Sequence, residues 1–161
     1  MTKILIKKLS KESIIPKYET DGSSGMDIAA SIEKELKIHP GEKAIIPTGF
    51  SLSIPKGFEV QIRPRSGLAA KKGISVLNTP GTIDADYRGE IKVILINLSK
   101  EEFIVEKNMR IAQMVVSPVI QAKLEEVKEL PKTFRGSGGF GSTGTKQWKL
   151  ATMILIDFLD K

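Results

Sequence analysis

The stretch FSLSIPKGFEVQIR, residues 50–63, decides the fold class. Residues 50–54 and 59–63 are short β-prone runs in which apolar and polar side chains alternate. Between them, Pro55-Lys56-Gly57 has the residue types of a tight turn. The stretch therefore predicts two short strands that follow each other closely along the chain.

The same pattern continues on both sides of this stretch. Further β-prone runs cover residues 3–8, 43–46, 90–97, 103–105 and 111–116, and turn signals such as His39-Pro40-Gly41-Glu42 and Thr79-Pro80-Gly81 lie between them. Helical patterns are scarce; residues 66–72 predict one short helix, with Ser66 as its N-cap and Gly73 as its end. No strand-helix-strand alternation appears, which disfavours a doubly wound fold. We expect an antiparallel all-β sandwich or barrel.

Composition limits the class of protein. The chain has 161 residues, 40% hydrophobic and 27% charged, which fits one globular domain. It has no cysteine, which excludes disulfides, thiolate zinc sites and cysteine nucleophiles. The N-terminal run lacks the features of a signal peptide, and no segment is apolar enough to cross a membrane, so we expect a cytoplasmic protein. The net charge of +6 is compatible with a nucleotide, with a nucleic acid or with a merely lysine-rich surface.

A glycine-rich segment, residues 135–144, is the first candidate site. Its backbone N–H groups, hydroxyls and Arg135 can surround phosphate oxygens. It contains G-x-G-x-x-G, but neither a clean strand before it nor a helix after it supports a dinucleotide fold, and Ser142 stands where a Walker loop needs lysine. A flexible tail is an equally good interpretation of this segment alone.

Two further segments carry candidate chemistry. In residues 63–69, Ser66 and Gly67 would present N–H groups at the start of a helical turn beside an arginine, although an ordinary capped turn fits as well. In residues 78–90, a carboxylate can activate water and Tyr87 can pack against a sugar or base, although an ordinary hairpin turn fits too. We expect Asp84 to be partly shielded after Ile83, and Asp86 to be solvated.

Two shorter segments contain single polar residues. Asp27 lies in an apolar strand, where a buried carboxylate needs a partner such as an arginine or a metal-bound water. Arg110 and Gln113 are three apart in a strand-like run, which predicts opposite faces. The single histidine, His39, lies in a turn and is expected to face solvent, which argues against a histidine triad or a histidine-ligated metal.

Taken together and in order, five segments resemble the five motifs of the trimeric deoxyuridine triphosphatase family. They are residues 25–28, 64–69, 81–89, 110–113 and 135–144, and the resemblance spans residues 3–144. It implies a β jelly-roll or distorted β-barrel, with one short helix and a flexible arm, that assembles as a homotrimer with sites at subunit junctions. On this basis we expect a jelly-roll domain over 1–134, a substrate-closing arm over 135–144, and an atypical extension over 145–161.

The resemblance also implies roles for individual residues. Asp84 is similar to the general base that activates water for attack on the α-phosphorus, and Tyr87 to the ring that excludes a 2′-hydroxyl. The implied contacts to uracil come from Asn78, Gly81, Thr82 and Ile83, with Phe140 covering the base. The implied phosphate contacts come from Arg65, Ser66, Gly67, Gln113, Arg135, Ser142 and Thr143, and Gly141 and Lys92 are further substrate contacts. Mg²⁺ would be carried by phosphates and waters, without a direct protein ligand, and Asp27 would be an outer-shell or structural residue.

The implied reaction is hydrolysis of dUTP to dUMP and pyrophosphate, which limits uracil incorporation into DNA and supplies dUMP for thymidylate synthesis. A dCTP deaminase of similar fold is one alternative, but it needs a catalytic glutamate where Asp84 and Tyr87 stand. A nucleotide-binding regulatory protein is another. A nucleic-acid-binding barrel fits less well, because one Trp, two Tyr and six Phe offer few stacking platforms. The role of residues 145–161 stays open.

Overall fold

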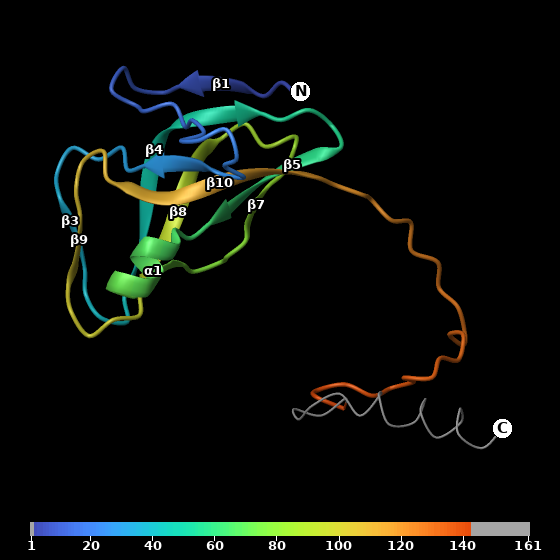
Figure 1. The fold of residues 1–161 in the computed structure, drawn as a ribbon. Helices are drawn as coiled ribbons and strands as arrows, with labels where there is room; N and C mark the ends of the chain where they lie inside the picture. The colour runs from blue at the N-terminus through green and yellow to red at the C-terminus, as the bar shows by residue number, and fades with distance from the viewer. Residues whose placement is uncertain (1, 143–161) are drawn as a thin grey trace. The chain divides into compact units, whose positions relative to one another are not determined.

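The computed structural model describes residues 2–142, and the elements that it contains are almost all strands (Figure 1). Their order is β1 (Leu5–Lys8), β2 (Met26–Ala29), β3 (Leu36–Ile38), β4 (Lys43–Ser53), β5 (Phe58–Arg63), α1 (Ser66–Lys72), β6 (Ile74–Val76), β7 (Gly81–Ile83), β8 (Glu90–Asn97), β9 (Phe103–Val105) and β10 (Arg110–Pro118). The prediction of an all-β, jelly-roll-like fold with one short helix is confirmed.

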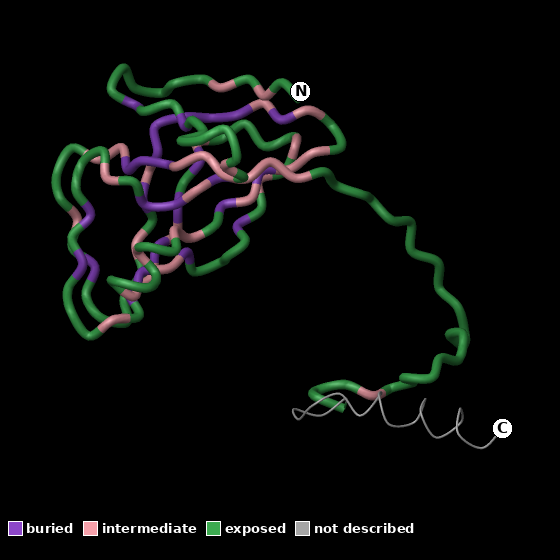
Figure 2. The backbone as a smooth tube through the Cα atoms, viewed as in Figure 1, coloured by how far each residue is buried: buried purple, intermediate pink, exposed green. Residues whose placement is uncertain are grey.

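The strands form two four-stranded sheets and a two-stranded ribbon. One sheet has the order β1-β4-β8-β6, the other has the order β2-β10-β5-β7, and β3 pairs with β9. Every pairing is antiparallel. Inward-facing side chains of both sheets make one core, with Phe50, Ile91, Val60 and Ile111 at most 1% exposed. Each such side chain contributes about 2 kcal/mol by leaving water, and Figure 2 shows these buried positions along the strands.

Strand β4 corrects the sequence prediction of two separate strands at 43–46 and 50–54. It runs without interruption from Lys43 to Ser53, with a shift of register against β8 between Pro47 and Ser51. Gly49 lies inside this irregularity with φ of 72°, a conformation that glycine adopts at little cost. The bulge therefore carries the strand past Pro47, where sequence reasoning placed a break.

Three of the shortest strands were not predicted. Strands β3, β6 and β7 have three residues each, which is too short to show a periodic pattern. Strands β8 and β9 match their predicted ranges, and on β8 buried positions alternate with more accessible ones. Long strands with one buried face were thus predictable, whereas three-residue strands depend on their neighbours.

Helix α1 has the predicted range but a different N-cap. Arg65, not Ser66, is the N-cap residue, with φ −89° and ψ 127° and no side-chain capping bond. Arg65 is extended because its guanidinium is bonded to groups of β2 and β10, while its carbonyl accepts the first helical bond from Ala69 N–H at 3.0 Å. Gly73 ends the helix in the left-handed region, at φ 64°, as predicted.

The chain divides into two units. The first ends at Gln121 and contains all the strands found within residues 2–142, and the second begins at Ala122. Within the second unit, residues 122–142 contain neither strand nor helix and are almost entirely exposed. The predicted domain boundary at 134 and the mobility of the arm stay predictions, while Thr143 and the extension 145–161 lie outside the described residues.

No helix among residues 2–142 is long and apolar enough to span a membrane. The cytoplasmic location stays a prediction from the sequence.

Candidate active site

Asp27 on β2 is held by two arginines from distant parts of the sequence. Its Oδ1 accepts from Arg65 Nε at 3.1 Å, and its Oδ2 accepts from an Arg110 NH1 group at 2.9 Å. Arg65 also donates to the backbone carbonyl of Arg110 at 3.1 Å. The Asp27 side chain is only 20% exposed, so these charge-assisted bonds offset its loss of water. The sequence predicted a partner such as an arginine or a metal-bound water, and the structure gives two arginines.

Gln113 on β10 completes this group. Its Nε2 donates to the Pro64 carbonyl at 3.0 Å, directly before Arg65, and its side chain lies so close to Gly25 that no β-carbon fits there. In the register of β10 and β2, Gln113 faces Asp27. The motif containing Asp27, the one containing Arg65 and the one containing Gln113 are therefore joined in one place, which we call the arginine cluster.

The prediction that Arg110 and Gln113 lie on opposite faces is wrong. Arg110 bonds the side chain of Asp27, and Gln113 is the register partner of Asp27, so both lie on its side of the sheet. The cause is a register shift between Arg110 and Ala112, which adds one residue to β10 and interrupts the two-residue period. Two successive buried residues, Ile111 and Ala112, mark the shift.

Ser66 and Gly67 lie beside the arginine cluster at the start of α1. Both are exposed, and the first turn of the helix has no acidic residue. Their N–H groups are among those that have no partner within a helix, and such groups attract anions. Together with Arg65, they provide a surface suited to phosphate oxygens.

The segment between β6 and β7 positions the predicted base-reading residues. Asn78 is exposed, and its amide lies against Gly81, where an added β-carbon would stand 3.1 Å from Asn78 Nδ2. Gly81, Thr82 and Ile83 form β7, which pairs with β5. The sheet therefore holds the backbone that is predicted to read uracil.

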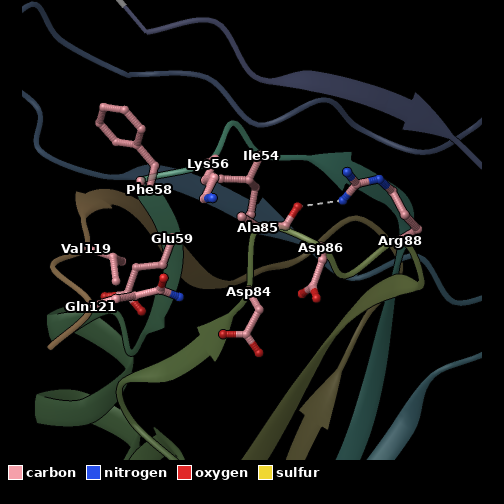
Figure 3. Close-up of a pocket in the computed structure, with 11 residues that line it drawn as sticks. Ile54, Lys56, Phe58, Glu59, Asp84, Ala85, Asp86, Arg88, Val119 and Gln121 are labelled. Carbon is pink, nitrogen blue, oxygen red and sulfur yellow. Dashed lines mark hydrogen bonds between the residues drawn. The ribbon is translucent and has the colours of Figure 1, made fainter. Parts of the chain in front are cut away.

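Asp84 follows β7 directly and lines a pocket of about 230 Å³ together with Tyr87, Lys92 and Glu90. It also lines a larger pocket, of about 720 Å³, on which Asp86, Glu59 and Gln121 lie (Figure 3). The expectation that Asp84 is partly shielded is wrong for the single chain, where Asp84 and Asp86 are both exposed. Ile83 does not cover Asp84, because Ile83 belongs to β7 and is paired there with Val60 of β5.

Arg88 holds the loop that carries Asp84 and Tyr87. It donates to the carbonyls of Ala85 and Tyr87 at 2.6 and 2.9 Å, and Figure 3 draws the first of these bonds. The Tyr87 N–H donates to the Asp84 carbonyl at 3.2 Å, which closes the turn. Sequence reasoning did not select Arg88, since an exposed arginine in a turn carries no pattern that reveals which carbonyls it reaches.

Glu90 ties the other end of the loop to the sheet. Its carbonyl accepts from the Tyr87 hydroxyl at 3.1 Å, and its Oε1 accepts from the Gly49 N–H at 2.9 Å. Lys92 Nζ lies 3.7 Å from Glu90 Oε2. We call Asp84, Tyr87 and Lys92, with the loop between them, the tyrosine loop.

The arginine cluster and the tyrosine loop are separate within one chain. Among residues 2–121, no hydrogen bond or ion pair joins them, and neither pocket that Asp84 lines includes Arg65, Ser66 or Gln113. One chain therefore presents two partial groups of candidate site residues.

The glycine-rich segment turns repeatedly within its described part. Arg135 Nε donates to the Gly138 carbonyl at 2.8 Å, and Ser142 N–H donates to the Gly139 carbonyl at 3.0 Å. Gly136, Phe140 and Gly141 have positive φ, and the Phe140 ring is fully exposed. Thr143, also predicted to bind phosphate, lies outside the described residues.

Comparison with known proteins finds relatives that cover most of the chain. The family model described as dUTPase matches residues 11–144. The chain is 59% identical over 133 residues to the deoxyuridine 5′-triphosphate nucleotidohydrolase of Brucella melitensis, covering 81% of this chain and 85% of the relative. The corresponding protein of Hydrogenobaculum is 56% identical over 144 residues, covering 89% and 99%.

Solved structures show the same fold. A mutant dUTPase of Staphylococcus bacteriophage 80alpha with dUpNHpp superposes with a TM-score of 0.81 at 26% identity, covering 90% of this chain and 100% of that one. Another structure of this phage dUTPase with dUpNHpp gives 0.78 at 28% identity, with the same coverage. On the family match, the relatives and the fold, the chain belongs to the dUTPase family.

Proposed function

We propose that the chain hydrolyses dUTP to dUMP and pyrophosphate. We also propose that it does so in the cytoplasm, the location predicted from the sequence. The observation that carries the proposal is the 230 Å³ pocket in which Asp84, Tyr87 and Lys92 meet beside β7. The relatives named as deoxyuridine 5′-triphosphate nucleotidohydrolases, and a related phage enzyme solved with dUpNHpp, support dUTP as the substrate. The reaction limits uracil in DNA and supplies dUMP for thymidylate synthesis.

Asp84 is the proposed general base. It takes a proton from water while the water oxygen forms a bond to the α-phosphorus, and the bond from that phosphorus to the bridging oxygen of pyrophosphate breaks. The Arg88 bonds to Ala85 and Tyr87 hold the loop, so the carboxylate keeps its position relative to the pocket. Positioning of this kind lowers the entropic part of the barrier.

The phosphate chain is proposed to lie against the arginine cluster. Arg65 is oriented by Asp27, and Ser66 and Gly67 offer N–H groups at the start of α1. Gln113 is fixed by its bond to Pro64 and is within the same cluster. From the arm, Arg135, Gly141, Ser142 and Thr143 are proposed to reach the terminal phosphates and Phe140 to cover the base, which would exclude water from the reacting groups.

Selection of the nucleoside is proposed to depend on shape. Asn78 and the β7 backbone at Gly81, Thr82 and Ile83 read the uracil edge, and the Tyr87 ring stands where a 2′-hydroxyl would project. Because β7 is paired with β5, the base-reading wall is backed by the sheet. A rigid wall rejects an added group more strongly than a compliant one.

Mg²⁺ is the proposed cofactor, and the side chains present fit a metal carried mainly by the substrate. Magnesium prefers oxygen ligands and keeps several waters while it binds phosphates. Both oxygens of Asp27 are engaged by arginines, which fits an outer-shell or structural role better than direct coordination. When bound, Mg²⁺ would neutralise phosphate charge and orient the phosphate chain.

A homotrimer with shared sites is also proposed. Its support is the separation, within one chain, of the arginine cluster from the tyrosine loop, together with the exposure of Asp84. A closed cyclic assembly brings the loop of one subunit next to the cluster of another through one repeated interface.

Pyrophosphate release from dUTP, dTTP, dCTP and UTP with Mg²⁺ tests the proposal, with wild type compared to Asp84→Asn. We expect release from dUTP only, and a loss of about 10²-fold or more in the variant, because the general base is gone. Ammonia release from dCTP would instead indicate the deaminase alternative. Tight dUTP binding without hydrolysis would indicate a regulatory nucleotide-binding protein.

A further inference from the structure

Gly89 lies directly under the ring of Tyr87. A β-carbon added at Gly89 would stand 2.5 Å from Tyr87 Cζ and 3.0 Å from Cε2, and it would also collide with the hydroxyl. Carbon atoms in contact ordinarily lie about 3.5–4.0 Å apart. The ring therefore occupies the space that any side chain at position 89 would need.

The ring is held in this place at its far end. The Tyr87 hydroxyl donates to the Glu90 carbonyl at 3.1 Å. Glu90 begins β8, is paired with Ser51 of β4, and accepts the Gly49 N–H at its carboxylate. Tyr87, although 45% exposed, is thus bonded across Gly89 to the first residue of β8.

The backbone at Gly89 does not itself require glycine, because its φ is outside the left-handed region. The atoms that a β-carbon would meet all belong to the end of a side chain that rotates about two torsions. An alanine at position 89 would consequently displace the Tyr87 ring and leave the fold in place.

We propose that Gly89 is a specificity-determining positioning residue, which leaves room for Tyr87 to lie across it and so places the ring against the sugar. The inference rests on the proposed function, in which the Tyr87 ring excludes the 2′-hydroxyl. Gly89 touches no substrate; it acts through the ring.

The ratio of kcat/KM for dUTP to kcat/KM for UTP tests the inference in wild type, Gly89→Ala and Gly22→Ala. Gly22 is a matched control, since it also lacks a positive φ and an added β-carbon meets nothing within 4 Å. We expect Gly22→Ala to keep the wild-type ratio. Gly89→Ala should lower the ratio by about tenfold or more. Shape alone discriminates against a substrate with an added hydroxyl by roughly hundredfold, so most of that discrimination would be lost.

A double-mutant cycle with Tyr87→Ala identifies the route of the effect. Tyr87→Ala should itself lower the ratio, and Gly89→Ala should add nothing in that background, because no ring is left to displace. A wild-type ratio in Gly89→Ala, an equal effect of Gly89→Ala with and without the ring, or a Gly89→Ala chain that does not fold would each overturn the inference.

The same measurements separate the inference from the proposed function. If wild type releases no pyrophosphate from dUTP, or if Tyr87→Ala keeps the ratio, the function or the role of the ring is wrong and the inference falls with it. If only Gly89→Ala leaves the ratio unchanged, the function stands and the inference alone fails.

Discussion

Asp27 shows how one side chain can organise three motifs. Each of its oxygens is taken by a different arginine, and one of these, Arg65, also reaches the carbonyl of the other. The acid is mostly buried, so its charge is stabilised by the guanidinium groups and not by water. Its role follows from this: it fixes the direction of Arg65, which the proposed reaction uses for phosphate.

Asp27→Asn should weaken both the fold and the use of substrate. The amide loses charge-assisted bonds, which costs about 1–3 kcal/mol of stability. A poorly oriented Arg65 should lower kcat/KM for dUTP by roughly tenfold, the equivalent of about 1.4 kcal/mol. Steady-state kinetics and urea unfolding measure the two effects.

Asp21→Asn is the control for Asp27→Asn, since Asp21 is an exposed acid of the preceding loop. It should change neither quantity. Wild-type kinetics in a folded Asp27→Asn enzyme would show that Arg65 needs no partner to bind phosphate.

Among elements, β4 shows best what sequence patterns can and cannot give. The two halves of β4 could be predicted as β-prone runs. Their continuation into one strand through Pro47 and Gly49 could not, because a bulge interrupts the two-residue alternation by which strands are found in a sequence. The bulge on β10 had the same effect on Arg110 and Gln113, whose faces were predicted wrongly. The residue types at the site could be predicted from the sequence. The partners of Asp27 could not, because they depend on how distant strands pair, and those of Arg88 could not, because they depend on the conformation of its own turn.

Gly49→Ala should destabilise the fold more than Gly57→Ala. Both glycines have positive φ, at 72° and 86°, so both substitutions incur backbone strain of about 1–3 kcal/mol. Only at Gly49 does an added β-carbon also meet side chains: it would stand 2.6 Å from Ser31 Oγ and would collide with Ser13, which is buried. Overpacking of this kind costs about 1–3 kcal/mol more.

Urea unfolding of the two glycine variants measures this difference. The difference between their losses of unfolding free energy gives the steric cost at Gly49, since the backbone strain from a positive φ is common to both variants. Equal losses of stability would mean that Ser13 and Ser31 move aside freely.

At the scale of the whole molecule, the main feature is the division of the candidate site. The tyrosine loop and the arginine cluster are each well formed in one chain, but they are not joined there. The sequence contained the motifs of both, while their separation appeared only when the strands were placed. The proposed trimer, with sites shared between subunits, would account for this separation.

Mixing two inactive variants should therefore restore activity. Asp84→Asn lacks the base and Arg65→Ala lacks a phosphate contact, so each homotrimer should be inactive. Mixed trimers, made by unfolding and refolding the two chains together, should contain roughly one intact site in three. Pyrophosphate release from dUTP by the mixture, compared with each variant refolded alone, measures the recovery. A mixture as inactive as its components would place the whole site within one chain.

The double pairing of Asp27 has a consequence for how such a sequence can evolve. The acid is bonded to residues 38 and 83 positions further along the chain, so replacing Asp27 removes this bond from both arginines, and replacing either arginine leaves Asp27 with the other alone. We expect each single replacement at these positions to weaken the arginine cluster, and a change at one of them to be tolerated best together with a change at another. Among descendants of this chain, Asp27, Arg65 and Arg110 should be inherited as one unit.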